Sequence, residues 1–281
     1  MTPVSFATTP RVSVSSWALH PLLGRTFPGR PGDADAYRMP SSEGTLDLLD
    51  VPARLAERGV RTMELCHFHL PSREDAYLAD LRAALDAAGV ELWSLLVDDG
   101  DITHPEHGER DAMWVKGWLD TAGTLGAKCA RVIAGQQEAT PETLGVARER
   151  LLGLAVDAYL RGVRVLTENW FPLLSRPAAV HALLGELNGM VGLNFDFGNW
   201  SGPDKYDALA SIAPLAASTH AKCHFQDGQP DAEDFSRCLA LLRDVHYQGP
   251  YTLVHGEPRD VWGSLEVQRE LLVTSGNLSN E

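Results

Sequence analysis

The sequence predicts one domain, covering residues 1–281, folded as a closed (β/α)8 barrel. Three observations support this prediction. Apolar, β-branched stretches alternate with amphipathic stretches, as in a parallel sheet covered by helices. Eight such units can be counted, the number that a closed barrel requires. The length of 281 residues is one that these barrels commonly reach as a single domain. An open doubly wound sheet is the alternative, disfavoured because no G-x-G-x-x-G follows the first strand and no P-loop occurs.

The individual elements follow from composition and periodicity. The expected strands are apolar and rich in β-branched residues, and they cover 12–17, 62–66, 91–97, 128–133, 163–168, 190–195, 216–221 and 251–254. The expected helices have apolar residues at helical spacing, and they cover 46–58, 74–88, 110–125, 141–161, 177–187, 206–212, 231–245 and 262–273. Residues 24–44, rich in Gly, Pro and Arg, form a candidate lid loop because ordinary connections are shorter. Residues 276–281 are expected to be a frayed tail.

Composition narrows the range of partners. The formal net charge of −14 and the lack of a basic run argue against binding to nucleic acid. No apolar run approaches the length of about 20 residues that a membrane span needs, and the N-terminus shows no secretory signal, so we expect a cytoplasmic protein. The four cysteines are scattered without a C-x-x-C pair, which favours buried thiols. The sequence leaves open whether the protein forms a homo-oligomer.

Ionisable residues stand where three successive strands end. Glu168, Asp196 and His220 each close an expected strand, and the carboxyl ends of barrel strands converge on one face. One such residue alone is more simply explained as a polar group satisfied at a strand end. Three on consecutive strands favour a shared site. Two carboxylates and an imidazole suit a divalent ion of the Mn²⁺, Mg²⁺, Co²⁺ or Zn²⁺ kind.

Short motifs around these residues resemble a known family. Thr167-Glu168-Asn169, Asn194-Phe195-Asp196-Phe197-Gly198-Asn199 and Thr219-His220-Ala221-Lys222 are similar, in order and spacing, to the sugar phosphate isomerase/epimerase family of the xylose isomerase-like TIM barrels. The resemblance implies that Glu168, Asp196 and His220 bind one metal ion together with a glutamate from strand eight.

The strand-eight glutamate is where this chain departs from the family pattern. The sequence reads Leu253-Val254-His255-Gly256-Glu257, so Val254 takes the usual ligand position. Three alternatives stay open: Glu257 reaches in from the turn, His255 substitutes, or the protein supplies no fourth ligand. The resemblance implies that Glu168 and Glu257 are also the proton-transfer groups.

The function implied by the resemblance is a divalent-metal-dependent isomerase or epimerase of a small sugar or sugar derivative, acting through an enediolate. Without Glu257 in place, epimerisation by two bases becomes doubtful, whereas isomerisation through Glu168 alone could survive. The alternatives are a metal-assisted lyase or dehydratase on the same barrel, because one fold hosts many chemistries, and a catalytically silent barrel that binds a sugar or metabolite.

Two cations are candidates for the site. Lys222 lies two residues after His220 and therefore points to the same side of its strand. It is a candidate catalytic group that could hold a carboxylate, phosphate or enediolate oxygen, or it could form an ion pair with one of the many acids. Arg131 lies inside an expected strand, where an arginine is seldom buried unless paired. It could orient substrate or form a salt bridge with Glu64 or Glu168.

Further candidates for substrate binding come from the first two strands. His67 and His69 follow the second strand and share a side if that strand continues, with His69 slightly favoured. Glu64, within that strand, is expected to orient a neighbour. Trp17 is a candidate wall of a sugar-sized pocket, because an aromatic face accepts C–H surfaces.

Overall fold

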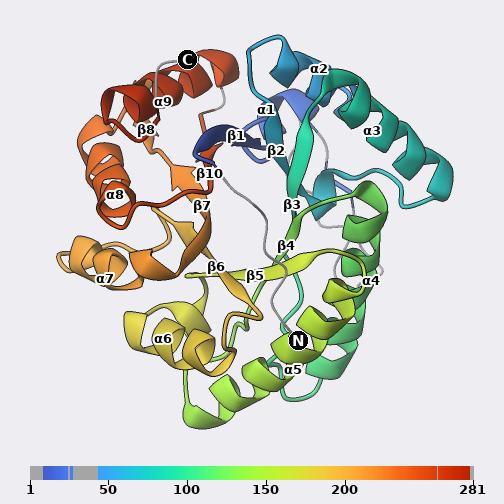
Figure 1. The fold of residues 1–281 in the computed structure, drawn as a ribbon, viewed down its shortest axis with the longest axis vertical. Helices are drawn as coiled ribbons and strands as arrows, with labels where there is room; N and C mark the ends of the chain where they lie inside the picture. The colour runs from blue at the N-terminus through green and yellow to red at the C-terminus, as the bar shows by residue number, and fades with distance from the viewer. Residues whose placement is uncertain (1–8, 25, 28–43, 258, 279–281) are drawn as a thin grey trace.

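The computed structural model describes residues 9–24, 26–27, 44–257 and 259–278. Most of the candidate lid at 24–44 and the last residues of the expected tail lie outside these ranges. Within them, the strands form a closed barrel with the helices outside it (Figure 1). The prediction of a single (β/α)8 barrel is confirmed.

Eight parallel strands make up the barrel in the described part of the chain, in the order β1-β10-β7-β6-β5-β4-β3-β2. Their bounds are β1 (Arg11–Ser15), β2 (Thr62–Cys66), β3 (Glu91–Val97), β4 (Cys129–Val132), β5 (Arg164–Glu168), β6 (Gly192–Asp196), β7 (Ala216–Lys222) and β10 (Pro250–Val254). The first and last strands close the ring, with Val14 opposite Leu253. Each predicted strand is present, displaced by at most a few residues at its ends.

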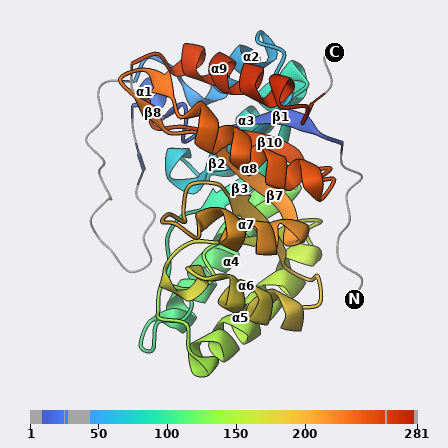
Figure 2. The same ribbon diagram turned by 90° about the vertical axis from the view of Figure 1, so that its left-hand side faces the viewer.

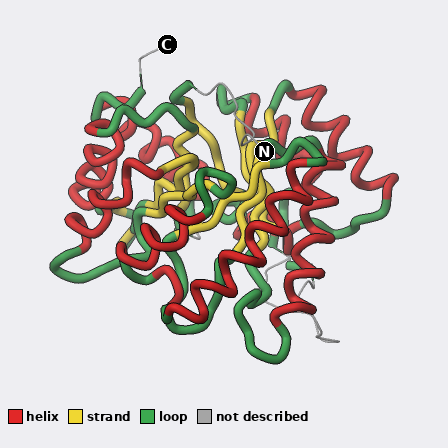
Figure 3. The backbone as a smooth tube through the Cα atoms, turned by 60° about the horizontal axis from the view of Figure 1, so that its bottom comes forward, coloured by secondary structure: helices red, strands yellow, loops and turns green. Residues whose placement is uncertain are grey.

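The helices form an outer layer around the strands, which Figure 3 shows as yellow segments inside red ones. Their bounds are α1 (His20–Leu23), α2 (Val51–Ala56), α3 (Asp75–Ala88), α4 (Gly108–Leu125), α5 (Pro141–Tyr159), α6 (Pro177–Glu186), α7 (Lys205–Ile212), α8 (Ala232–Asp244) and α9 (Val261–Thr274). Consecutive helices contact each other around the barrel, as α7, α8 and α9 do in Figure 2. No helix among the described residues is both long and apolar enough to span a membrane.

Local sequence explains where the longer helices begin and end. At the start of α5, Thr140 and Thr143 form a reciprocal capping box and Pro141 occupies the first turn, where its missing N–H costs nothing. Gly89 and Gly126 end α3 and α4 in the left-handed conformation, with φ of 61° and 76°. An L side chain is strained in this conformation, which is why glycine is preferred there.

Three segments differ from the expectation. The helix expected over 46–58 is a short 3-10 turn, Leu48–Asp50, followed by α2, because Asp47 caps the turn through the N–H of Leu49. A two-stranded hairpin, β8 (Phe225–Gln226) with β9 (Gln229–Pro230), follows β7 and was not expected. The prediction of a frayed tail is wrong for Asn277. This residue is buried, and its amide donates to Leu239 O and Tyr251 Oη.

The core has two parts. Most buried apolar side chains lie between the barrel and its helices and form one continuous cluster. Inside the barrel, Trp93, Cys129 and Leu166 form a small apolar cluster. Along β5, alternation by two residues places Leu166 in this interior cluster and Glu168 in the cavity at the carboxyl end of the strands. The apolar layer therefore supports the polar side chains from below.

Candidate metal and substrate site

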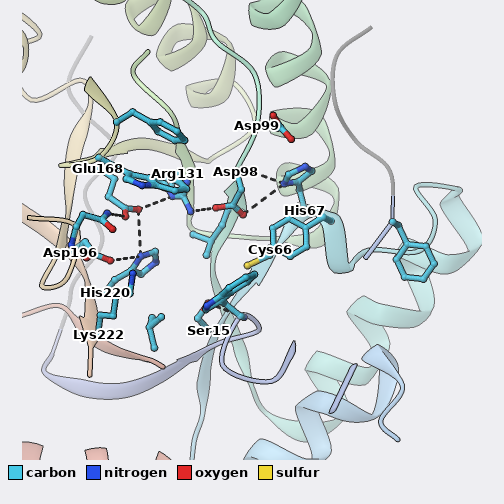
Figure 4. A pocket seen from close by; sticks show the side chains of 18 residues that line it. Ser15, Cys66, His67, Asp98, Asp99, Arg131, Glu168, Asp196, His220 and Lys222 are labelled. Carbon is cyan, nitrogen blue, oxygen red and sulfur yellow. Dashed lines mark hydrogen bonds and ion pairs between the residues drawn. The ribbon is translucent and has the colours of Figure 1, made fainter. Parts of the chain in front are cut away.

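A cavity of about 370 Å³ lies at the carboxyl ends of the barrel strands, shown in Figure 4. Each strand contributes to its lining, with Ser15, Cys66, Leu96, Arg131, Glu168, Asp196, Lys222 and Val254 as examples from β1, β2, β3, β4, β5, β6, β7 and β10. Its volume is near the lower end of the range for small-molecule sites. It is the size of cavity that a small substrate would fill.

The three predicted metal ligands lie together in this cavity. Glu168, Asp196 and His220 end or nearly end β5, β6 and β7, and one ligand atom from each lies within 4.8 Å of the others. Nδ1 of His220 is 3.4 Å from Oε2 of Glu168 and 3.5 Å from Oδ2 of Asp196. All three side chains are buried. The donor set of two carboxylates and one imidazole fits a divalent cation.

His220 is oriented by a carboxylate on the opposite side of its ring. Its Nε2 lies 2.9 Å from Oε2 of the fully buried Glu64 on β2. In the neutral ring, which is the form that a metal ion would bind, a proton on Nε2 leaves the Nδ1 lone pair facing Glu168 and Asp196. Burial disfavours a charged ring, but the carboxylates of Glu168 and Glu64 outweigh burial and raise the pKa of His220 well above its ordinary value. The predicted orienting role of Glu64 thus has a defined partner.

Asp196 is held by the loop that follows β6. Its Oδ1 accepts hydrogen bonds from the backbone N–H groups of Gly198, at 2.6 Å, and Asn199, at 2.8 Å. The amide of Asn199 also donates to Oε1 of Glu168 at 2.6 Å. The amide of Asn169 pairs with both backbone groups of Asp196. These bonds direct Oδ2 of Asp196 toward His220.

Glu168 is balanced by a buried cation. Nε of Arg131 lies 3.1 Å from Oε2 of Glu168, an ion pair without hydrogen-bond alignment, and Nη2 of Arg131 donates to Asp98. Burial raises the pKa of Glu168, but Arg131 and His220 outweigh it and lower that pKa to about 2. Of the two roles predicted for Arg131, the structure shows the salt bridge with Glu168, and the guanidinium also borders the cavity.

Asp98 was not recognised as a site residue from the sequence. It follows β3 directly, at the same edge of the barrel as Glu168, and this position was the available signal. Burial opposes its ionisation, but Arg131 and then His67 outweigh burial and hold the pKa of Asp98 well below its usual range. Asp98 therefore forms a charged wall of the cavity together with Arg131.

The two histidines after β2 have different surroundings. The strand stops at Cys66, as predicted, and a 3-10 turn covers His67–His69, so the condition under which the two histidines would share a side is not met. His67 lines the cavity, and its Nδ1 accepts the N–H of Asp98 at 3.1 Å. His69, the favoured candidate, is not among the lining residues. Its ring is hydrogen-bonded through Nδ1 to Oγ of Ser16, at 2.8 Å, and through Nε2 to Nδ1 of His20, at 3.0 Å.

The remaining lining residues include Trp17, as expected for a pocket wall, and Lys222. Trp17 stacks on His20 with 5.5 Å between ring centroids. Lys222 is the register partner of Val254 on β10, and both side chains border the cavity. No hydrogen bond or ion pair of the Lys222 ammonium is found among the described residues.

Strand eight of the barrel, β10, delivers Val254 to the cavity. Among the described residues, neither His255 nor Glu257 belongs to its lining or to the group of candidate metal ligands. Both are buried elsewhere: Oε1 of Glu257 accepts the N–H of Arg259 at 3.0 Å, and Nδ1 of His255 accepts the N–H of Glu257 at 3.1 Å. Because β10 ends at Val254, the residues beyond it turn away from the strand direction.

Fold and site together define the class of this protein. It is a (β/α)8 barrel with a carboxylate, carboxylate and imidazole group suited to a metal ion at the carboxyl ends of its strands. A family model described as xylose isomerase-like TIM barrel matches residues 52–271, and the chain belongs to that family. The resemblance inferred from the motifs is confirmed.

Several solved structures share the fold. A xylose isomerase domain protein from Planctomyces limnophilus is 17% identical with a TM-score of 0.69, covering 97% of this chain and 100% of that one. A xylose isomerase-like TIM barrel protein from Mycobacterium smegmatis, in complex with magnesium, is 16% identical with a TM-score of 0.67 and covers 99% of both chains. D-allulose 3-epimerase from Methylomonas sp., in complex with D-allulose, is 15% identical with a TM-score of 0.64, covering 99% of this chain and 96% of that one. No curated protein sequence matches this chain.

Proposed function

We propose that this protein is a divalent-metal-dependent isomerase or epimerase of a small sugar or sugar derivative. The observation that carries the proposal is the buried group of Glu168, Asp196 and His220, whose ligand atoms lie within 4.8 Å in a cavity of about 370 Å³. Two similar folds support it, one a magnesium complex and one an epimerase with bound D-allulose.

Glu168, Asp196 and His220 would hold the cation. An ion of the Mn²⁺, Mg²⁺, Co²⁺ or Zn²⁺ kind would polarise a substrate carbonyl and stabilise negative charge on its oxygen when the neighbouring carbon loses a proton. Glu64 keeps the His220 ring in the orientation that this role requires, because it accepts a hydrogen bond on the far side of the ring. Asn199 positions the carboxylate of Glu168 and, through its backbone, that of Asp196.

Glu168 is the base in this proposal. Arg131 and His220 lower its pKa and keep it ionised at neutral pH, so it can accept a proton from a substrate carbon that a bound metal ion would make more acidic. A second carboxylate from β10 would serve two-base epimerisation, but Val254 lines the cavity there and Glu257 does not. The arrangement therefore favours isomerisation, in which Glu168 would remove a proton from one carbon and deliver a proton to the next through an enediolate, while a hydroxyl proton passes from one of the two oxygens to the other. Asp98 and Arg131 border the cavity next to Glu168, where substrate hydroxyl groups would find partners.

The test begins with the metal. Protein stripped with a chelator is expected to take up about one Mn²⁺ per chain and to melt at a higher temperature when the ion is present, because a ligand that binds the folded state stabilises it. Glu168→Gln should lose most of this gain, whereas Glu266→Gln, on the exposed side of α9, should keep it. A metal-free chain whose melting is insensitive to Mn²⁺ and to Glu168→Gln would contradict the proposal.

The chemistry is tested next with a panel of aldoses and ketoses in deuterated water. Isomerisation through an enediolate exchanges a carbon-bound hydrogen with solvent, so deuterium should enter the product, as followed by nuclear magnetic resonance. A lyase would instead give a product that has lost water or a carbon fragment. A binding barrel would perturb ligand signals without incorporating label.

A further inference from the structure

One cation of the cavity has no hydrogen-bond or ion-pair partner among the described residues. The cavity lining includes one arginine and one lysine, Arg131 and Lys222. Arg131 is neutralised by Asp98 and Glu168. Lys222 forms no ion pair or hydrogen bond within the described ranges, although Asp196 and Glu168 belong to the same lining. Its ammonium is therefore available to a group that enters the cavity.

The position of Lys222 is defined by a glycine. A Cβ atom placed on Gly198 would lie 2.6 Å from Cδ and 3.2 Å from Cγ of Lys222, so the lysine stem lies directly against this backbone. Gly198 belongs to the loop that binds Asp196 through its N–H. Long basic side chains commonly bury their stems along a surface and leave the charged end free. This contact brings the ammonium to the side of the cavity that holds Asp196 and His220.

The neighbouring strand supplies no negative charge. Val254 is the register partner of Lys222, and it presents methyl groups to the cavity. Strands β5, β6 and β7 thus each contribute a polar side chain to the cavity, whereas β10 contributes an apolar one. A carboxylate at this position would pair with Lys222 and add a further oxygen ligand beside Glu168, Asp196 and His220. Without one, a partly buried ammonium lacks the counter-ion that would offset its desolvation.

We propose that the missing carboxylate is part of the substrate, which would be a sugar acid: a polyhydroxylated 2-oxo or 2-hydroxy acid whose carboxylate lies against Lys222 and Val254. This inference rests on the proposed function and narrows its substrate class. A carboxylate next to the reacting carbon supplies the negative charge that is missing beside Lys222. It also supplies an oxygen on the side of the metal ligands where Val254 offers none.

A phosphate fits this wall less well. Phosphate groups are typically held by several donors at once, often backbone N–H groups of a helix start or a glycine-rich loop. Beside Lys222, the backbone N–H groups of Gly198 and Asn199 are already used by Asp196. A single ammonium suits a group with one negative charge.

The test compares ligands of equal chain length. The full-length protein, loaded with Mn²⁺, is titrated by calorimetry with D-xylonate, xylitol and D-xylulose 5-phosphate. D-xylonate is expected to bind at least about tenfold more tightly than the other two, the ratio that corresponds to about 1.4 kcal/mol. Equal binding of D-xylonate and xylitol, preference for the phosphate, or no binding of D-xylonate would overturn the inference.

Variants identify the residue responsible. Lys222→Met keeps the stem and removes the charge, and it should abolish the preference for D-xylonate over xylitol. Lys128→Met is the matched control, because it removes the same charge just before β4, at the amino end of the barrel, and should keep the preference. Gly198→Ala leaves the ammonium in the protein but displaces it, so it should also reduce the preference. A preference that persists in Lys222→Met would assign carboxylate recognition to another group and refute the inference.

A carboxylate built into the protein gives the converse test. Val254→Glu places a negative charge beside Lys222. It should therefore weaken D-xylonate binding, leave the affinity for xylitol unchanged and tighten Mn²⁺ binding. An unchanged D-xylonate affinity in folded Val254→Glu would contradict the inference. Mn²⁺ uptake is measured separately: a chain that binds no metal refutes the proposed function, while equal affinities in a metal-loaded chain refute only the sugar-acid assignment.

Discussion

Oε2 of Glu64 lies 2.9 Å from Nε2 of His220, across the barrel interior from β2 to β7. Neither residue is near the other in sequence, and Glu64 is shielded completely from solvent. The pair determines which ring nitrogen of His220 faces Glu168 and Asp196. Partners of this kind orient metal-binding histidines and raise their basicity.

Replacing Glu64 with glutamine should therefore weaken metal binding without removing a ligand. An amide can still bond to Nε2 but carries no charge, so we expect Mn²⁺ affinity to fall about 10- to 100-fold. Competition with a chelating dye measures the affinity, and Glu266→Gln serves as a control because its side chain is half exposed on α9. An unchanged affinity in folded Glu64→Gln would show that the hydrogen bond has no role in the site.

Replacing Arg131 with methionine should destabilise the metal-free protein. Both Asp98 and Glu168 would keep buried charges without their partner, and breaking a buried pair typically costs about 3–5 kcal/mol. Urea unfolding measures the free energy of unfolding. Mn²⁺ should recover part of the loss because it would neutralise Glu168. Arg131→Lys, which retains a charge, should lose less of the free energy of unfolding. Equal losses in the two variants would mean that Arg131 contributes through packing and not through its charge.

Asn199 links two of the candidate ligands, since its amide bonds to Glu168 and its backbone N–H to Asp196. Asn199→Ala removes only the first of these bonds. We expect a folded protein whose Mn²⁺ affinity is about tenfold weaker, because the Glu168 carboxylate loses one of the groups that orient it. Asn199→Asp should lower the stability of the metal-free protein, because its carboxylate would face that of Glu168. A stable, tightly binding Asn199→Asp variant would argue against this arrangement.

His69 should make the stability of the protein depend on pH. Burial, with smaller contributions from neighbouring groups, lowers its pKa from 6.5 to about 3. In the unfolded chain this histidine gains a proton below about pH 6.5, whereas folded His69 stays neutral until about pH 3. Its contribution to stability is thus complete above pH 6.5 and falls as the pH decreases, by about 1.4 kcal/mol per unit.

The groups that act on His69 are His20, Asp98 and His67, in that order. His69→Gln should flatten the dependence of unfolding free energy on pH between about 4 and 6.5, measured by urea titration. His107→Gln, which removes an exposed imidazole, is the comparison variant. Identical slopes in wild type and His69→Gln would mean that this ring is not a source of the pH dependence.

The order of strands and helices could be predicted because its signals are local. Helix-ending glycines such as Gly89 and Gly126, and apolar strand segments such as Glu91–Val97, depend on residues within a few positions of each other. The hairpin of β8 and β9 is two residues per strand and was missed because it is too short to show a periodic pattern.

The candidate ligands could also be predicted. Glu168, Asp196 and His220 stand at the ends of strands, and the barrel topology alone brings strand ends to one face. The same reasoning favoured His69 over His67, whereas His67 lines the cavity, because a 3-10 turn follows β2 and changes the direction of both side chains. It also gave Asp98 no role, since a turn-forming aspartate after a strand has the same sequence pattern whether it meets solvent or an arginine.

By itself, then, the sequence determined the barrel, the order of its main strands and helices and the three residues that could hold a metal ion, because periodicity and position at a strand end are properties of short segments. Only the tertiary structure decided how charges are paired: Arg131 with Asp98 and Glu168, Glu64 with His220, and Lys222 with no partner among the described residues. Those pairings join residues far apart in the chain, and electrostatic energy depends on distance and burial, which no local pattern specifies.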